Sequence, residues 1–453
     1  MASRPARAKT LDTLDYFHVD RTAPPPDEPA VDKIVTDLIN PQGRERMPGV
    51  AVAVRKNARL VHLNCYGYAN LETGKKITLD TIFDLGSLSK QFTAIAVLQL
   101  VLEKKLKLTD HLSKFFKDFP RYADTTTIAD LLHHTAALPA YDDIYVQSRL
   151  AEEDWYDRAM TKRDHWYPRM ARRKRREITN EDVRRWIATQ KLLPRLPETE
   201  FEYCNSGYVV LAAIVAKVTR MRFAEYLKHY LFEGMAMSDT YVFDESTRFS
   251  SRSREIVNHA KCYTRIKNRF LPVGYTPLNF ITGDGNVHST IVDLLRWELS
   301  LTGHEIFGLC FPDEAKKMSG GVSFRDLMWK PTEIKHGKQV SYGAGWYLKR
   351  DKYEQRDVIK GRRVKRKYES RAEYHRGKWL GWRGYVARAS RWPVPAAGKN
   401  VDPNEWDSLG IIVLSNATFG ENQFMTCRIA QEISRFYWGR LKRDNIINSF
   451  NCG

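Results

Sequence analysis

The sequence predicts a mixed α/β fold, of the α+β kind, in which an antiparallel sheet built from both chain ends is flanked by helices. Three observations support this prediction. Short strand-like segments occur near the N-terminus, strand signals return only after residue 340, and helical periodicity dominates between them. A length of 453 residues with 43% hydrophobic residues also fits a globular chain with a large core.

The first elements are an arm, a helix and a hairpin. Residues 1–26 end in three prolines and are predicted to form an extended N-terminal arm before a single domain, 27–453. Residues 27–40 carry apolar side chains at helical spacing, which predicts an amphipathic helix. Two apolar segments, 49–54 and 60–64, flank a short polar stretch and are typical of a β-hairpin.

The middle of the chain is predicted to be helical and its end to return to strands. The domain therefore has an α/β part, 27–127 and 340–453, and an inserted mainly helical part, 128–339. We expect helices over 128–132, 181–190, 207–218, 223–231 and 292–301, strands over 345–348, 385–388 and 409–415, and a last helix over 422–441 with Ile429, Ile433, Phe436 and Tyr437 as its core face.

The charge is strongly basic, with 73 Lys and Arg against 54 Asp and Glu, a formal net charge of +19. Much of the excess lies in two segments, 158–185 and 349–378, which we interpret as basic loops. Such loops are a solvated surface or a binding site for an acidic ligand: nucleic acid, an anionic membrane or an acidic substrate.

Other sequence features exclude several classes of protein. No apolar stretch approaches the roughly 18–20 residues that span a bilayer, and no secretory signal is visible. The six cysteines are scattered, without zinc-site spacing or the density of a disulfide scaffold, and no phosphate loop or dinucleotide fingerprint is present. We therefore predict a cytoplasmic protein without cofactor, metal site or membrane span; its oligomeric state cannot be predicted.

The strongest chemical signal is Ser87-x-x-Lys90, which precedes an apolar run. If a helix begins near Gly86, both residues lie on one face and the Lys90 amine reaches the Ser87 hydroxyl. A serine becomes an effective nucleophile when a neighbouring group takes its proton.

A second acid/base group is needed to protonate the leaving group and to activate water. The candidate is Tyr203, within Tyr203-Cys204-Asn205, because a phenol beside cations ionises below its usual pKa of about 10. Asn205 is expected to hydrogen-bond Lys90 and a substrate amide. The similar tripeptide Tyr68-Ala69-Asn70 fits a hairpin turn better.

The third element is a strand edge that binds the acyl group and lends a backbone N–H to an oxyanion. His375-Arg376-Gly377-Lys378 fits, because Gly377 permits close approach and His375 offers a switchable cation. Lys335-His336-Gly337 is a rival, but it lacks the glycine and aromatic residues that follow Lys378.

These motifs, in this order, resemble the serine hydrolases related to class C β-lactamases, DD-carboxypeptidases, D-aminopeptidases and family VIII esterases. The resemblance covers most of residues 30–440 and includes the flanking segments 81–87, 128–139, 283–290, 342–346 and 413–416. It implies a β-lactamase/transpeptidase-like fold and an acyl-enzyme on Ser87. Lys90 and Tyr203 would move its proton, the backbone N–H groups of Ser87 and Lys378 would form the oxyanion hole, and Tyr203 would activate water for deacylation.

Departures from the family pattern bear on the substrate. Many β-lactamases carry Lys-Thr-Gly where this chain has His375-Arg376-Gly377, which the resemblance associates with esterases and peptidases. We therefore expect cleavage of an ester or amide of a small acyl compound or of a D-amino-acid-containing peptide, with β-lactamase or acyltransferase activity as the runner-up. The alternative is a catalytically retired member of the fold that binds nucleic acid or another polyanion. Which of Lys90 and Tyr203 is the first base stays open, and Cys204 is interpreted as packing rather than as a nucleophile.

Overall fold

The computed structural model describes residues 28–57, 59–142, 178–191, 197, 199–244, 258–266, 269–273, 278–301, 327–334, 337, 339–359, 362–394, 407–419 and 424–438. The predicted arm, residues 158–177 of the first basic segment, and Lys335 and His336 of the rival motif lie outside these ranges.

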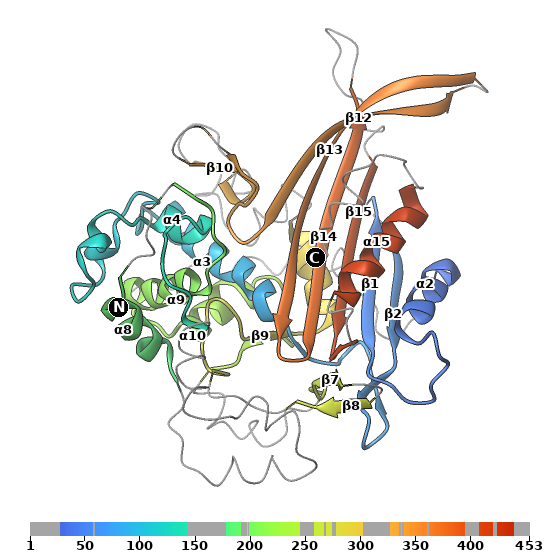
Figure 1. Ribbon diagram of the computed structural model, residues 1–453, viewed down its shortest axis with the longest axis horizontal. Coiled ribbons are helices and arrows are strands. Elements are labelled where there is room, and N and C mark those ends of the chain that lie inside the picture. Colours follow the sequence, from blue (N-terminus) through green and yellow to red (C-terminus); the bar gives the residue numbers. More distant parts are fainter. Residues whose placement is uncertain are drawn as a thin grey trace.

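A six-stranded antiparallel sheet is built from both ends of the chain. Its strands are β1 (Val50–Lys56), β2 (Arg59–Tyr66), β12 (Tyr347–Ile359), β13 (Arg362–Trp379), β14 (Trp382–Pro393) and β15 (Asp407–Ser415). They lie in the order β12-β13-β14-β15-β1-β2 (Figure 1). Strand β1 pairs with β2 in the predicted hairpin and with β15, where Val50 lies opposite Ser415. The predicted fold class is confirmed.

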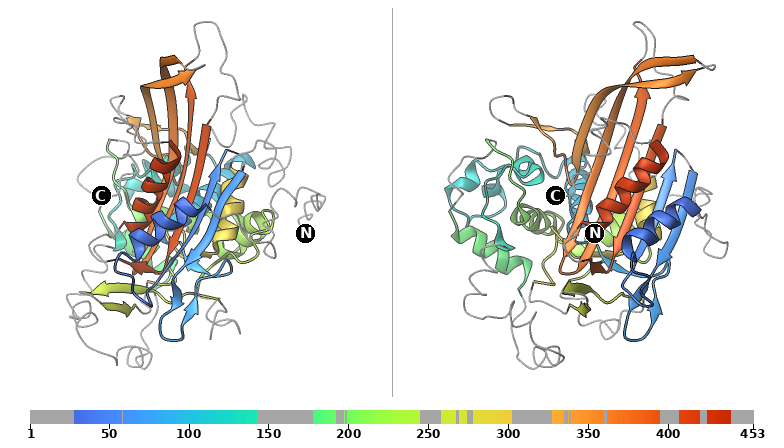
Figure 2. Two further views of the ribbon diagram at one scale, coloured as in Figure 1. Left: turned by 90° about the vertical axis from the view of Figure 1, so that its right-hand side faces the viewer. Right: turned by 45° about the vertical axis from the view of Figure 1, so that its right-hand side comes forward.

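Side-chain alternation along β1 gives the sheet two separate cores. Val50, Val52 and Val54 pack into one core, whereas Ala51 and Ala53 pack into the other. Helices α2 (Pro29–Ile39) and α15 (Met425–Trp438) cover the first face, as both views of Figure 2 show. Of the predicted core face of α15, Ile429 and Ile433 are fully buried, but Phe436 is 45% exposed, so that part of the prediction is wrong.

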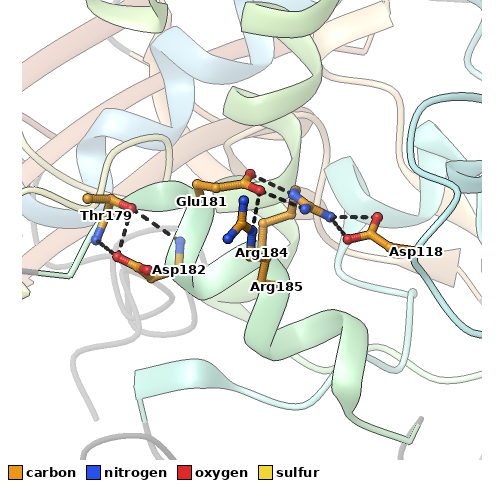
Figure 3. Close-up of polar contacts among 6 residues, drawn as sticks. All are labelled: Asp118, Thr179, Glu181, Asp182, Arg184 and Arg185. Carbon is orange, nitrogen blue, oxygen red and sulfur yellow. Dashed lines mark hydrogen bonds and ion pairs between the residues drawn. The ribbon is translucent and has the colours of Figure 1, made fainter.

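The other face of the sheet meets the helical region, and the active-site candidates lie between them. Helix α9 packs against α3, α4, α8 and α10, whereas α12 packs on β1 and β15. Thr127 and Thr179 form capping boxes at the starts of α4 and α8, and Figure 3 shows the one at Thr179. The helices are α3 (Lys90–Leu102), α4 (Ile128–His133), α8 (Asn180–Thr189), α9 (Asn205–Thr219), α10 (Phe223–Leu227) and α12 (Ile291–Ser300).

Short strands also occur outside the main sheet. They pair as β3-β4, β5-β9-β6, β16-β7-β8 and β10-β11. Their bounds are β3 (Tyr68–Asn70), β4 (Lys75–Lys76), β5 (Phe83–Asp84), β6 (Tyr241–Val242), β7 (Tyr263–Ile266), β8 (Arg269–Pro272), β9 (Val287–Ser289), β10 (Thr332–Glu333), β11 (Gln339–Val340) and β16 (Ala417–Thr418).

The second basic segment, 349–378, is not a loop. Apart from residues 360–361, it lies in β12 and β13, and β12 pairs along its whole length with residues 362–374 of β13. The interpretation as a loop failed because cations hide the strand signal, although β-branched and aromatic residues are interspersed among them.

Two observations bear on the cellular setting. Cys427 is disulfide-bonded, whereas Cys65, Cys204 and Cys262 are free thiols. A disulfide runs against the expected reducing compartment, so the cytoplasmic location stays a prediction. In the part of the chain that the structure describes, no helix is both long and apolar enough to cross a bilayer.

Candidate active site

Ser87 lies in a 3-10 turn that is held by contacts with Asp84 and with β13. A 3-10 turn, Gly86–Ser89, precedes α3, so the α-helix begins four residues later than expected. Gly86 has φ +51°, and a Cβ atom there would lie 2.9 Å from the backbone nitrogen of Lys378. The Asp84 carboxylate accepts a hydrogen bond from the Gly86 N–H at 2.8 Å. Only glycine combines this positive φ with so close an approach to the backbone of β13.

Lys90 lies at the centre of the candidate site and has no exposed surface. Its Nζ donates to Ser87 Oγ at 3.2 Å, to Asn205 Oδ1 at 2.6 Å and to the backbone oxygen of Asp284 at 2.8 Å. Three acceptors satisfy the three donors of an ammonium group. The predicted pair of Ser87 and Lys90 is therefore within hydrogen-bonding distance.

Burial makes the Lys90 amine a weaker base than that of an exposed lysine. Desolvation lowers the pKa of its ammonium to about 8, although the charges of Asp284 and Asp142 act in the opposite direction. A lysine with this pKa is mainly charged at pH 7 and mainly neutral at pH 9. It can therefore act as a proton acceptor near physiological pH.

Asn205 forms hydrogen bonds with both Lys90 and the carboxylate of Asp142. It is the first residue of α9, and its Nδ2 donates to Asp142 Oδ2 at 2.6 Å while its Oδ1 accepts from Lys90. Its hydrogen bond to Lys90 is present as expected. The Cys204 thiol donates to the Leu138 oxygen, and burial raises its pKa to about 11, which agrees with a packing role.

Tyr203 lies beside Lys90, but its phenol is not ionised. The Lys90 Nζ is 5.0 Å from the Tyr203 ring centroid, and the phenol oxygen is buried beside the Ser87 hydroxyl. Burial raises the pKa of Tyr203 well above its ordinary value. The expected lowering of this pKa is wrong, because desolvation outweighs the hydrogen bond with Ser87 and the charge of Arg376.

His375 and Gly377 bring the edge of β13 to the same place. The Tyr203 and His375 ring centroids are 6.1 Å apart, and a Cβ atom at Gly377 would lie 2.0 Å from the Leu85 oxygen. His375 Nδ1 donates to the Arg376 oxygen at 2.8 Å, so Nε2 accepts from the Tyr342 hydroxyl at 3.1 Å. Burial lowers the pKa of His375 to about 3, so the expected switchable cation is a neutral imidazole.

Lys378 contributes its backbone at the Ser87 turn. The close approach at Gly86 shows that the Lys378 nitrogen lies beside this turn. Tyr68, of the rival tripeptide, lies in β3 and packs beside Arg46. The structure thus gathers Ser87, Lys90, Tyr203, Asn205, His375, Gly377 and Lys378.

Sequence reasoning missed the acidic residues and the aromatic support around Lys90. Asp284 is buried, and its Oδ2 accepts from the Tyr141 hydroxyl at 2.9 Å. The His134 ring packs against Tyr203 at a tilt of 36°, with ring centroids 4.3 Å apart, and its Nδ1 accepts from the Cys204 N–H. Asp284 lies in the segment 283–290 that carried the family resemblance, so an acid there was a visible signal that went unused.

Comparison with known proteins places these motifs in one family. The family model described as Beta-lactamase matches residues 31–432. Penicillin-binding protein 4* of Bacillus subtilis is 24% identical over 79% of this chain and 68% of its own length. D-aminopeptidase of Brucella anthropi is 28% identical over 63% of this chain, which spans only 48% of that relative.

Solved structures share the fold at low identity. A D-amino acid amidase from Ochrobactrum anthropi SV3 superposes with a TM-score of 0.59 and 18% identity, over 93% of this chain and 99% of that one. The octameric penicillin-binding protein homologue from Pyrococcus abyssi also gives a TM-score of 0.59, with 21% identity over 90% of this chain and 77% of that one. At these identities, the likeness shows the fold alone.

Proposed function

This chain belongs to the beta-lactamase family, and from that premise we propose that it is a serine hydrolase that forms an acyl-enzyme on Ser87. The observation that carries the proposal is the 3.2 Å hydrogen bond between Ser87 Oγ and the Nζ of a fully buried Lys90. A scaffold without chemistry has no need to bury a lysine against a serine hydroxyl.

Lys90 is the first base in this proposal. Its pKa of about 8 leaves a useful neutral fraction near pH 7, whereas the Tyr203 phenol holds its proton well above that range. Ser87 Oγ attacks the substrate carbonyl as its proton passes to the neutral Lys90 amine. The resulting oxyanion accepts hydrogen bonds from the backbone N–H groups of Ser87 and Lys378.

Tyr203 serves as the acid that protonates the leaving group. A protonated phenol with a raised pKa donates its proton only to a strongly basic partner, such as the departing alkoxide or amine. The proton that Lys90 has taken then restores the phenol. In the second half-reaction the neutral Lys90 amine accepts a proton from the water that attacks the acyl carbon, and returns it to Ser87 Oγ as the bond from the acyl carbon to Ser87 breaks.

The substrate is an ester or an amide rather than a β-lactam. A neutral His375 supplies no positive charge for the carboxylate of a β-lactam, and Arg376 stacks on Phe424 at 5.0 Å. A small acyl ester or a D-amino-acid amide needs no such charge. The similarity to a D-aminopeptidase favours this class.

Labelling with a fluorophosphonate probe tests the proposal. Wild-type protein is expected to be labelled and Ser87→Ala is not, with equal thermal unfolding of the two as a check on folding. Turnover of p-nitrophenyl esters, D-amino acid amides and a chromogenic cephalosporin then ranks the substrates. We expect esters to exceed the cephalosporin, and the reverse order would contradict the assignment of His375.

The alternative is the catalytically retired protein that binds a polyanion. Failure of a folded wild-type chain to label and to turn over any of these substrates would favour it. Transfer of the acyl group to an added alcohol or amine, in place of water, would identify an acyltransferase. The cytoplasmic location remains a prediction.

A further inference from the structure

A chain of buried polar side chains lies behind the turn that carries Ser87. Strands β5 and β9 pair there, and Asp84 lies directly opposite His288. Both side chains are buried, with Asp84 Oδ2 at 3.7 Å from His288 Nε2. His259 continues the chain, because its Nε2 lies 2.8 Å from His288 Nδ1. The acyl-enzyme mechanism proposed above assigns no role to these three side chains.

The backbone oxygen of Ala260 fixes the tautomers of both histidines. His259 Nδ1 lies 2.9 Å from this oxygen, which has no hydrogen to give, so Nδ1 carries a proton and donates it. The Nε2 atom of a neutral His259 is then an acceptor, and it receives the hydrogen bond from His288 Nδ1. The Nε2 atom of a neutral His288 is consequently a bare acceptor, and it faces the carboxyl group of Asp84.

Two acceptors that face each other in a buried place need a proton between them. With Asp84 ionised and both imidazoles neutral, a carboxylate oxygen and an imidazole lone pair would lie face to face, which is costly away from water. One further proton satisfies both atoms and leaves the cluster without net charge. On Asp84, this proton occupies Oδ2 and is directed at His288, while Oδ1 accepts from the Gly86 N–H.

The surroundings place the proton on the acid rather than on a histidine. Burial raises the pKa of Asp84, although the Gly86 N–H acts in the opposite direction, and the charge of Asp284 raises this pKa further. Burial lowers the pKa of His259 to about 4 and that of His288 well below its ordinary value. Both imidazoles are therefore neutral at pH 7, as the tautomer argument requires.

Other titratable groups beside the pair bring no charge to it. Tyr241, in β6, lies opposite His288, with ring centroids 5.4 Å apart. Cys262 precedes β7, and Arg383 of β14 acts on its thiol. The charge of Asp84 acts on both Tyr241 and Cys262, but burial is the main cause that raises their pKa values, so the phenol and the thiol keep their protons at pH 7.

Strand β9 also fixes the Ser87 turn through its backbone. The Leu85 N–H donates to the Val287 oxygen at 3.0 Å, and the Val287 N–H donates to Ser89 Oγ at 3.0 Å. Asp84 supplies a contact between these two, at the Gly86 N–H. The three contacts hold the turn on both sides of the nucleophile.

The charge of Asp84 matters because the Gly86 N–H, which it binds, is one residue from the Ser87 N–H that would receive the oxyanion. A carboxylate at this place would repel the developing negative charge, and a buried site screens that repulsion only weakly. A neutral acid keeps the hydrogen bond to the turn and removes the repulsion.

We propose that Asp84 is a positioning residue that acts as a neutral acid: its proton faces His288 Nε2, and it orients the Ser87 turn without placing a negative charge at the oxyanion hole. The catalytic consequence rests on the proposed hydrolase function. The proton arrangement is a property of the folded protein and is measured without turnover.

Infrared spectroscopy of the full chain at pH 7 tests where the proton lies. The difference spectrum of wild type minus Asp84→Asn should contain the C=O stretching band of a protonated carboxyl group. Asp130→Asn is the matched control, because Asp130 is also buried but accepts hydrogen bonds from the hydroxyls of Thr127 and Thr135. Its difference spectrum should contain a carboxylate band instead. A carboxylate band for Asp84 as well would overturn the proposal.

Nitrogen-15 NMR of the imidazoles tests the partner of this proton. The signals of His288 are identified by their loss in His288→Phe. We expect a neutral ring with a proton on Nδ1 and none on Nε2 at pH 7. A doubly protonated His288 would show an ion pair with a carboxylate, and would contradict the neutral acid.

Two substitutions test the catalytic consequence. Asp84→Asn keeps an acceptor for the Gly86 N–H and offers an N–H to His288 without any charge, so kcat/KM for a p-nitrophenyl ester at pH 7 should stay within about threefold of wild type. Asp84→Ala lacks both groups and should lower kcat about thirtyfold or more with little change in KM, because a misplaced turn acts on the oxyanion. Thermal unfolding of both variants reports whether they are folded.

The rescue by asparagine decides between a neutral acid and a carboxylate. A folded Asp84→Asn that is as slow as Asp84→Ala would show that the turn needs the charge, and would overturn the proposal. A wild-type chain that is neither labelled nor active would refute the hydrolase function and with it the catalytic role of Asp84. The infrared and NMR results decide the proton arrangement in either case.

Discussion

Replacing Asp284 by Asn should raise the proposed hydrolase activity at neutral pH. The carboxylate of Asp284 raises the pKa of Lys90, whose Nζ also donates to the Asp284 backbone oxygen. Burial raises the pKa of Asp284 itself to about 6, so this carboxylate is charged at the pH where Lys90 titrates. Its removal should lower the pKa of Lys90 by about one unit.

The expected rate change follows from the fraction of neutral Lys90. With a pKa of about 8, roughly one Lys90 in eleven is neutral at pH 7, and kcat/KM should rise about tenfold to a plateau above pH 9. With a pKa lowered by about one unit, roughly half is neutral at pH 7. Asp284→Asn should therefore raise kcat/KM at pH 7 about fivefold, although the plateau falls somewhat because a weaker base is present.

The assay is hydrolysis of an uncharged p-nitrophenyl ester between pH 6 and pH 10, with Ser87→Ala subtracted as the background. Asp293→Asn is the matched control, because Asp293 is also a buried carboxylate but binds Thr240 and Arg296 rather than Lys90. Its pH profile should match wild type. A profile for Asp284→Asn that stays in place or moves to higher pH would refute the assignment of Lys90 as the first base.

Three further predictions concern the acid, the backbone contact and the helical region. Tyr203→Phe should lower kcat about a hundredfold or more with little change in thermal unfolding, because Phe keeps the ring that packs against His134; equal kcat would remove Tyr203 from the chemistry. Gly377→Ala should abolish probe labelling, because its Cβ would overlap the Leu85 oxygen at 2.0 Å, whereas Gly285→Ala, with nothing within 4 Å, should label normally. Arg184 binds Asp118 and Glu181 (Figure 3), and Arg184→Ala should cost about 1–2 kcal/mol of unfolding free energy in urea. The more exposed Arg185 serves as its control, and a loss within about 0.5 kcal/mol is expected for Arg185→Ala.

That the sheet is built from both chain ends could be predicted from the sequence, because the apolar pattern of its inner strands and of the covering helices is clear. Val50 to Val54 is apolar on both faces, which requires cover on both sides, and α2 and α15 have the matching apolar stripes. The long strands β12 and β13 were not predicted in full, because Lys and Arg occupy positions where a buried strand would be apolar.

The sequence predicted which residues form the candidate site, but it did not predict their protonation states. The motifs name Ser87, Lys90, Tyr203 and His375, yet desolvation depends on residues that pack around them from distant segments. Tyr342 and His134 close the site around His375 and Tyr203, and no spacing in the sequence reveals that contact. For this reason the pKa of Tyr203 and the charge of His375 were predicted wrongly, whereas the hydrogen bond from Lys90 to Asn205 was predicted correctly.

The pairing of β1 with β15 cannot form until most of the chain has been synthesised. About 350 residues lie between the end of β1 and the start of β15. At roughly 5–20 residues per second, a ribosome needs about 20–70 s to make them. During that interval β1 has β2 as a neighbour, but its other edge must wait for the last part of the chain. The nascent N-terminal half thus carries an apolar, unpaired strand edge that invites contact with other chains, and a chaperone that shields this edge would raise the yield of folded protein.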